Sequence, residues 1–90
     1  MGEVIALIRL MPDGVLSDDE IQTIIDEVRN VIKEPVKLGR VEVKNIAFGL
    51  RGLNVTVSVP DSEGGLDPVV EVFLKIDKIE NVEVVDIGRI

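Results

Sequence analysis

The feature that most constrains the fold is a strict alternation of apolar and polar residues over positions 53–59. The apolar residues of this segment are Leu53, Val55, Val57 and Val59, and the polar ones are Asn54, Thr56 and Ser58. Because successive side chains of a β-strand point to opposite faces, this segment predicts a strand with one buried face and one polar face. Such one-sided burial is typical of an antiparallel sheet that is covered on only one side.

Three further segments have strand character. Residues 3–11 are apolar on both faces, which indicates a central strand. Residues 37–48 form a second predicted strand. Its apolar residues change from odd positions (Val41, Val43) to even positions (Ile46, Phe48), so we expect a bulge near Lys44-Asn45, as is common on an edge strand. Residues 81–87 form the last predicted strand.

Two segments predict helices, each with a single apolar stripe. Ser17 and Glu20 have the spacing of a capping box, and the first helix is expected to end at Glu34-Pro35. Its apolar stripe consists of Ile21, Ile24, Ile25, Val28 and Ile32. Asp67 is expected to cap the second helix, with Pro68 at its first position. The inner face of that helix consists of Val69, Val72, Phe73 and Ile76.

The order strand, helix, strand, strand, helix, strand predicts an α+β fold of ferredoxin-like type. Helices with one apolar stripe each must cover the same side of one sheet, and right-handed crossovers then give a four-stranded antiparallel sheet with strand order 4-1-3-2. Ninety residues suit one such domain, so residues 1–90 are predicted to form a single ferredoxin-like unit.

The composition leaves little chemistry to the chain itself. It contains no His, Cys, Tyr or Trp, and Phe48 and Phe73 are its only aromatic residues. Thiolate catalysis, disulfides and cysteine-type zinc sites are therefore excluded, and acidic groups such as Asp61, Glu63 and Asp67 match no compact calcium loop. We expect a protein that is not an enzyme, holds no metal or cofactor, and acts on another protein.

Charge is distributed unevenly along the chain, whose net charge is −7. Residues 1–34 and 60–90 each carry eight acids and three bases, a net of −5, whereas residues 35–59 carry four bases and one acid, a net of +3. Acidic surfaces repel nucleic acids and anionic membranes, so neither is expected as a direct partner. The basic segment fits either an edge strand protected by solvated lysines or a patch that faces a protein or nucleotide.

The N-terminal segment predicts a cytoplasmic protein. Glu3 stands where a secretory signal would carry positive charge, and the apolar runs are too short to span a membrane.

Two segments stand out as candidate functional sites. Phe48 lies beside a glycine at a strand-to-strand corner, where a bulky apolar side chain is better placed for a partner than for a core. Arg89 lies in the terminal segment 86–90. The predicted topology puts the two at opposite ends of the sheet, roughly 20 Å apart if about six strand residues separate them. That span indicates a large protein partner with two separate contact surfaces.

Several motifs together resemble archaeal elongation factor 1-beta. They are Ile46-Ala47-Phe48-Gly49-Leu50, Val59-Pro60-Asp61, Gly64-Gly65-Leu66-Asp67-Pro68 and Asp86-Ile87-Gly88-Arg89-Ile90. The resemblance covers the whole chain and implies a ferredoxin-like fold. It also implies a guanine-nucleotide exchange factor that promotes replacement of GDP by GTP on the GTPase elongation factor 1-alpha.

The same resemblance implies roles for particular residues. In eukaryotic relatives the aromatic residue matching Phe48 docks into the second domain of the GTPase. A penultimate lysine there reaches the magnesium and phosphate site, and Arg89 stands at that position here. Arg89 is thus the candidate catalytic residue. The candidate partner-binding residues are Ile46, Ala47, Phe48, Gly49, Leu50, Arg51, Asp61, Gly64, Gly65 and Ile90.

Other interpretations remain open. A small-ligand-binding regulatory domain of ferredoxin-like fold could use the polar face formed by Asn54, Thr56 and Ser58. An RNA-recognition module would need stacking aromatics on its central strands, and these are missing. In simpler structural roles, Phe48 would be a half-buried core residue and Arg89 a solvated residue beside the terminal carboxylate. Gly49 and Gly52 would be turn residues.

Overall fold

The strands and helices of the described residues follow the predicted order. The computed structural model describes residues 3–33, 36–60 and 66–89. Its elements are β1 (Glu3–Pro12), α1 (Asp18–Val31), β2 (Lys37–Ala47), β3 (Leu50–Pro60), α2 (Asp67–Leu74) and β4 (Ile79–Arg89). The first helix therefore ends before Glu34-Pro35, the predicted stop, which lies outside the described residues.

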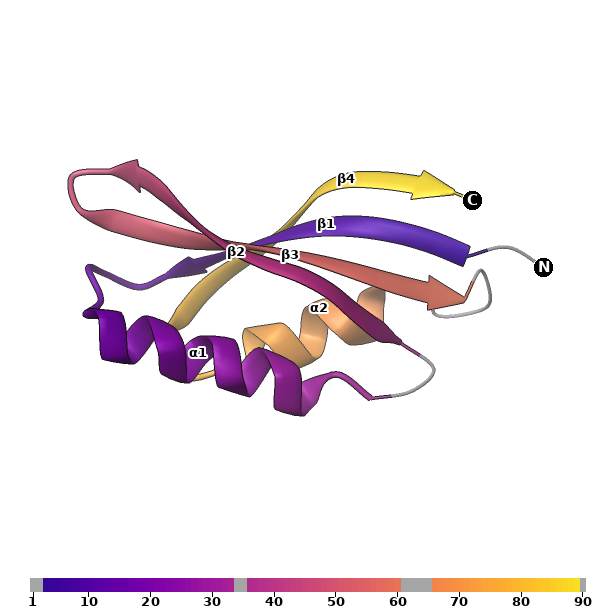
Figure 1. The fold of residues 1–90 in the computed structure, drawn as a ribbon, viewed down its shortest axis with the longest axis horizontal. Coiled ribbons are helices and arrows are strands. Elements are labelled where there is room, and N and C mark those ends of the chain that lie inside the picture. The colour runs from indigo at the N-terminus through magenta and orange to yellow at the C-terminus, as the bar shows by residue number, and fades with distance from the viewer. Residues whose placement is uncertain (1–2, 34–35, 61–65, 90) are drawn as a thin grey trace.

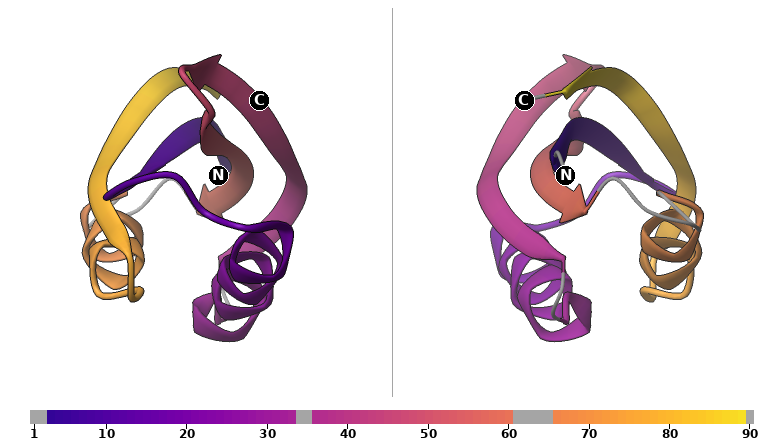
Figure 2. Two further views of the ribbon diagram at one scale, coloured as in Figure 1. Left: turned by 90° about the vertical axis from the view of Figure 1, so that its left-hand side faces the viewer. Right: turned by 90° about the vertical axis from the view of Figure 1, so that its right-hand side faces the viewer.

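The four strands form one antiparallel sheet with the order β2-β3-β1-β4. This is the predicted order read from the other edge, and it confirms the ferredoxin-like α+β fold with β1 as a central strand. Figure 1 shows both helices on one side of the sheet. Figure 2 shows that the twisted sheet arches over them, with α1 beneath the β2 edge and α2 beneath the β4 edge.

The core lies between the sheet and the two helices. The apolar face of β3 is buried as the alternation predicted, with Leu53, Val55, Val57 and Val59 at most 2% exposed. Phe73 of α2 is the largest fully buried side chain, and Ile21, Ile24 and Val28 of α1 complete the contact from the other helix. One of the two aromatic residues is thus a core residue.

The start of α1 is held as the capping box predicted. The Ser17 hydroxyl accepts a hydrogen bond from the Glu20 backbone N–H at 3.2 Å, and the Glu20 carboxylate accepts one from the Ser17 N–H at 3.1 Å. The corresponding expectation for α2 was wrong: Leu66, not Asp67, is the N-cap residue, and its side chain makes no capping hydrogen bond. Pro68 in the first turn starts this helix without a side-chain cap because its φ is already helical.

The pairing of β2 with β3 is irregular at two places. One register shift lies between Asn45 and Ala47, next to the predicted bulge, and a second, unpredicted one lies between Leu38 and Val41. Gly52 is not a turn residue as expected but lies within β3, opposite Lys44. The chain reverses three to four residues earlier, at Phe48-Gly49.

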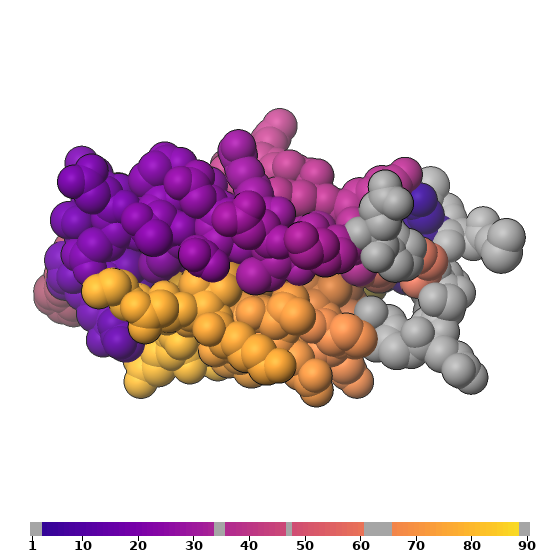
Figure 3. Space-filling model, turned by 90° about the horizontal axis from the view of Figure 1, so that it is seen from below, coloured from indigo at the N-terminus to yellow at the C-terminus, as the bar shows by residue number. Residues whose placement is uncertain are grey.

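The helical face carries a groove between the two helices. Figure 3 shows α1 lying alongside α2 on this face. The groove has a volume of 420 Å³, with Ile24, Val72 and Ile76 among its apolar lining and Glu20 and Lys78 among its charged lining. Among the described residues, no helix is long and apolar enough to cross a membrane.

Candidate functional site

The turn between β2 and β3 presents Phe48 to solvent. Ala47 pairs with Leu50, so only Phe48 and Gly49 connect the strands, with φ values of 53° and 81°. Two central residues with positive φ are the signature of a type I′ hairpin turn. The phenylalanine is 98% exposed, which excludes the half-buried core role. A bulky residue in this backbone region is an outlier that points to a function.

Ile46 extends the apolar surface on the side of the hairpin that faces away from the helices. A Cβ atom at Gly52 would lie 2.8 Å from Ile46 Cδ1 and 3.4 Å from Met11 Sδ. The missing side chain at Gly52 therefore gives Ile46 room to lie across the strand. Ile46 is still 43% exposed, so the apolar surface is available to a partner.

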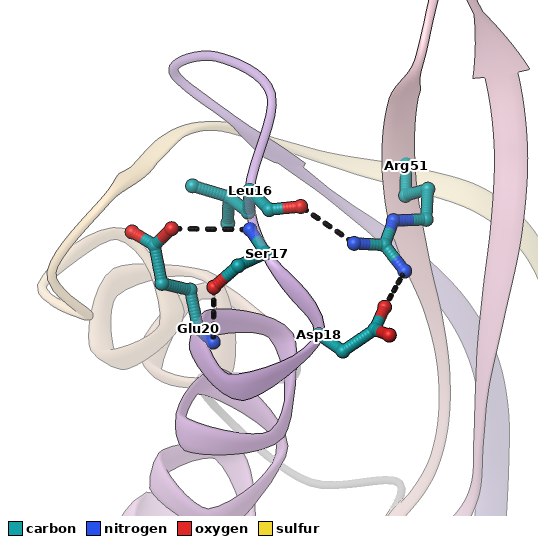
Figure 4. A network of polar contacts seen from close by, with 5 residues as sticks. All are labelled: Leu16, Ser17, Asp18, Glu20 and Arg51. Atoms are coloured by element: carbon teal, nitrogen blue, oxygen red, sulfur yellow. Dashed lines mark hydrogen bonds and ion pairs between the residues drawn. The ribbon is translucent and has the colours of Figure 1, made fainter.

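Arg51 ties the hairpin to the segment that precedes α1. Its Nη1 donates to Asp18 Oδ1 at 2.6 Å and its Nη2 donates to the Leu16 carbonyl oxygen at 2.5 Å (Figure 4). Its side chain is only 24% exposed, whereas that of Asp18 is 91% exposed. The predicted partner-binding arginine is therefore engaged within the chain on two sides.

The opposite end of the sheet carries the C-terminal segment. Arg89 pairs with Val4 in β1, and Val4 pairs in turn with Val59 in β3. The backbone of Arg89 thus ends the strand at the edge β4, as expected. The Arg89 and Ala47 side chains lie outside the described residues, as do Asp61, Gly64, Gly65 and Ile90, so the roles expected of them stay predictions.

The two candidate sites are farther apart than expected. Val59, beside the C-terminal end, is nine residues beyond Leu50, which closes the hairpin turn. At about 3.3 Å per strand residue this is about 30 Å, against the expected 20 Å. Strands β3 and β4 are longer than predicted, and the longest dimension of the fold is 42 Å. Figure 1 shows the hairpin turn and the C-terminus at opposite ends.

Most of the other charged contacts are local. Glu42 lies 3.6 Å from the Arg40 guanidinium and 3.4 Å from the Lys44 ammonium, so an acid accompanies the basic edge strand. Lys78 lies 2.9 Å from Glu20, and this hydrogen bond, with those from Ser17, lowers the pKa of Glu20 to about 2. Among the described residues, no three acidic groups gather closely enough to hold a metal ion.

Two of the polar side chains on the uncovered face are also engaged within the chain. Asn54 Oδ1 accepts a hydrogen bond from Arg9 Nε at 3.5 Å, and Ser58 Oγ donates one to Glu3 Oε2 at 3.0 Å. A small ligand on this face would have to compete with these contacts.

Comparison with known proteins decides the family. The model of the EF-1 guanine nucleotide exchange domain matches residues 5–90. The chain belongs to this family. It is 42% identical to elongation factor 1-beta of Methanosarcina barkeri, with all of both chains covered. It is 39% identical to elongation factor 1-beta of Methanocella arvoryzae, with 99% of this chain and 98% of the relative covered. The resemblance to archaeal elongation factor 1-beta is thereby confirmed.

A solved structure supports the fold alone. The ACT domain from GTP pyrophosphokinase of Chlorobium tepidum is similar to this chain with a TM-score of 0.67 and 15% identity. The similarity covers 93% of this chain and 88% of that domain. At this identity the likeness extends to the arrangement of strands and helices and not to any ligand.

Proposed function

We propose that the protein promotes exchange of GDP for GTP on elongation factor 1-alpha. The observation that carries this proposal, beyond family membership, is the 98% exposed Phe48 held at positive φ in a two-residue turn. Such a side chain makes no contribution to the core, and its backbone conformation is unfavourable by about 1–3 kcal/mol. A partner with an apolar recess supplies the missing contact.

The two ends of the sheet have different roles in the proposed mechanism. Phe48 anchors the factor on one domain of the GTPase, and about 30 Å away Arg89 approaches the magnesium and phosphate site of another. Magnesium bridges phosphate oxygens to the GTPase, so a cation brought beside the metal weakens its binding. Arginine is a planar fork and not a compact ammonium, so Arg89 acts by charge competition with the metal and not by occupying its position.

Exchange requires the factor to lower the activation free energy of GDP release from the GTPase. An acceleration of about 10³–10⁵-fold corresponds to about 4–7 kcal/mol. This energy must come from contacts that the factor makes only with the opened GTPase. By linkage, a factor that weakens nucleotide binding is equally weakened by nucleotide, so it binds the nucleotide-free GTPase best.

Release of a fluorescent GDP from purified elongation factor 1-alpha tests the proposal. We expect the wild-type protein to accelerate release. Arg89→Ala should lose most of the acceleration even at saturating concentration, whereas Arg89→Lys should keep much of it. Phe48→Ala should act normally only at higher concentration. A folded wild-type protein that leaves GDP release unchanged would refute the exchange function.

Nucleotide competition tests the linkage separately. Added GTP should dissociate the complex of the factor with nucleotide-free elongation factor 1-alpha, as seen by gel filtration. A complex that persists at saturating GTP contradicts the mechanism even if release is accelerated.

A further inference from the structure

We propose that the docking surface at the hairpin is composite, and that Val15 enters the same apolar recess of elongation factor 1-alpha as Phe48. This inference rests on the proposed function and adds a residue from a different part of the chain. It also gives Arg51 a positioning role in place of a direct contact with the partner.

Val15 lies directly beside the hairpin turn. Both of its Cγ atoms are 3.8 Å from the position that a Cβ atom of Gly49 would occupy, which is ordinary van der Waals distance. Val15 is nevertheless 65% exposed. An apolar side chain from the β1–α1 segment therefore lies next to Phe48-Gly49 and leaves most of its surface free.

Val15 is exposed but firmly placed, because the chain is anchored on both sides of it. Before it, the Asp13 N–H donates to the Lys78 carbonyl oxygen at 2.9 Å. After it, Leu16 is buried in the core, and the Leu16 carbonyl accepts the hydrogen bond from Arg51. An exposed side chain between two anchors is pre-organised for binding, which lowers the entropic cost of association.

Arg51 links the two loops that carry the exposed side chains. It follows the hairpin turn by two residues, and its guanidinium contacts Leu16 and Asp18, the first and third residues after Val15 (Figure 4). The planar fork makes the two contacts through two separate nitrogens held in a fixed geometry, whereas a lysine has a single terminal nitrogen on a flexible stem. The geometry thus indicates that Arg51 keeps Val15 beside Gly49 in the hairpin turn and does not itself reach the partner.

The arrangement defines the chemistry of the partner surface. Phe48 is exposed in the turn, Val15 lies against the adjacent Gly49, and Ile46 lies over Gly52 within the same hairpin. The complementary site on the GTPase must be an apolar recess wide enough for a phenyl ring with aliphatic groups beside it. Buried aromatic anchors surrounded by smaller apolar contacts are typical of interface hot spots.

The first experiment measures binding to nucleotide-free elongation factor 1-alpha by calorimetry, together with GDP release over a range of factor concentrations. Val15→Ser should raise both Kd and the concentration for half-maximal release about fivefold, with the maximal rate unchanged. Leu74→Ser is the matched control, because Leu74 is 46% exposed on α2, and it should change neither value. If Val15→Ser behaves like Leu74→Ser while Phe48→Ala weakens binding, the composite surface is refuted and the proposed function stands. If the wild-type protein neither binds nor accelerates release, both proposals fail.

The second experiment separates positioning by Arg51 from direct contact. Asp18→Ala removes the acceptor of Arg51 Nη1 and keeps the arginine itself, so a positioning role predicts weaker binding for Asp18→Ala, in the same direction as Arg51→Ala. Asp19→Ala, a change in the same helical turn, should have no such effect. If Asp18→Ala leaves binding unchanged or strengthens it while Arg51→Ala weakens it, Arg51 contacts the partner directly and its positioning role is refuted.

Discussion

Phe48 and Lys78 are the two residues other than glycine that have positive φ in the described part of the chain, at 53° and 71°. The fold treats them very differently. The Lys78 carbonyl oxygen accepts a hydrogen bond from the Asp13 N–H at 2.9 Å, and its ammonium group pairs with Glu20 at 2.9 Å. Phe48 is almost fully exposed. Both residues thus have the same unfavourable backbone conformation, but contacts within the fold compensate for it at Lys78 and hardly do so at Phe48.

This difference distinguishes a structural outlier from a functional one. At Lys78, contacts within the fold offset the strain and connect the end of α2 to the loop before α1. At Phe48, the exposed ring makes almost no contact within the described residues, and the proposed docking would supply the contact that offsets the strain. Backbone outliers persist where the surroundings determine them, and an uncompensated one at an exposed apolar side chain is evidence for binding.

Replacing Phe48 and Lys78 in turn by asparagine is the strongest test of whether strain is compensated at Lys78 and not at Phe48. Asn-Gly is the favoured pair for a type I′ turn, so Phe48→Asn should stabilise the free protein by about 1 kcal/mol. For a domain of this size that raises Tm by about 4–8 °C. The same change should weaken binding to elongation factor 1-alpha about 30-fold, the loss expected for a hot-spot residue. Thermal unfolding followed by circular dichroism and the GDP-release assay measure the two effects.

Lys78→Asn is the control for that experiment. It relieves the backbone conformation equally but removes the ion pair with Glu20, so its Tm should rise clearly less than that of Phe48→Asn. Its GDP-release activity should stay unchanged. An equal rise in Tm for both variants would show that the compensation at Lys78 has no energetic weight, and the comparison would lose its basis.

Gly49→Ala is expected to have the next largest effect. Gly49 has a φ of 81°, and a Cβ atom there would meet Val15 only at van der Waals distance. The expected loss of about 1–2 kcal/mol in unfolding free energy therefore comes from the backbone alone. Urea denaturation measures it. A neutral result would mean that the turn can change its conformation, and Phe48 could then not be regarded as strained.

Sequence patterns predicted those parts of the molecule that depend on local periodicity. The alternation at 53–59, the capping box at Ser17 and Glu20, and the order of elements were sufficient to give the topology. Once the topology was known, the opposite placement of Phe48 and Arg89 followed. These features depend on neighbours within a few residues, or on the few ways in which such elements can pack.

Contacts between loops distant in sequence could not be predicted in this way. Val15 follows a glycine in a short polar segment, and nothing in its neighbourhood indicates that it meets Gly49. In the sequence, Arg51 looked like an exposed basic residue that could bind a partner. Its actual contacts, Leu16 and Asp18, lie more than thirty residues earlier, so no local pattern indicated them. Gly52 was mistaken for a turn residue because its packing against Ile46 depends on side chains that meet only in the folded sheet.

The smallest expected effect concerns the compensation at Lys78 and its dependence on pH. The hydrogen bond with Lys78, followed by those with Ser17, lowers the pKa of Glu20 from 4.5 to about 2. A group whose pKa is lower in the folded state contributes stability above its unfolded pKa, and the contribution is lost as the pH falls through the folded value. The Glu20 contribution should therefore be complete above about pH 4.5 and decline toward about pH 2. Lys78 behaves oppositely: Glu20 raises its pKa above 10.5, so its contribution is present below that value and declines at higher pH.

Denaturant midpoints measured from about pH 5 to about pH 2.5 would detect the Glu20 contribution. All carboxylates of the chain titrate in this range, so the informative quantity is the difference between the wild-type protein and Glu20→Gln. We expect that difference to shrink as the pH falls, because protonated Glu20 and glutamine are both neutral. In the Lys78→Asn background, the difference in denaturant midpoint caused by adding Glu20→Gln should already be smaller at about pH 5. If removing Lys78 leaves the pH dependence of Glu20 unchanged, Ser17 alone holds the carboxylate, and the strain at residue 78 is offset only by the backbone hydrogen bond from Asp13.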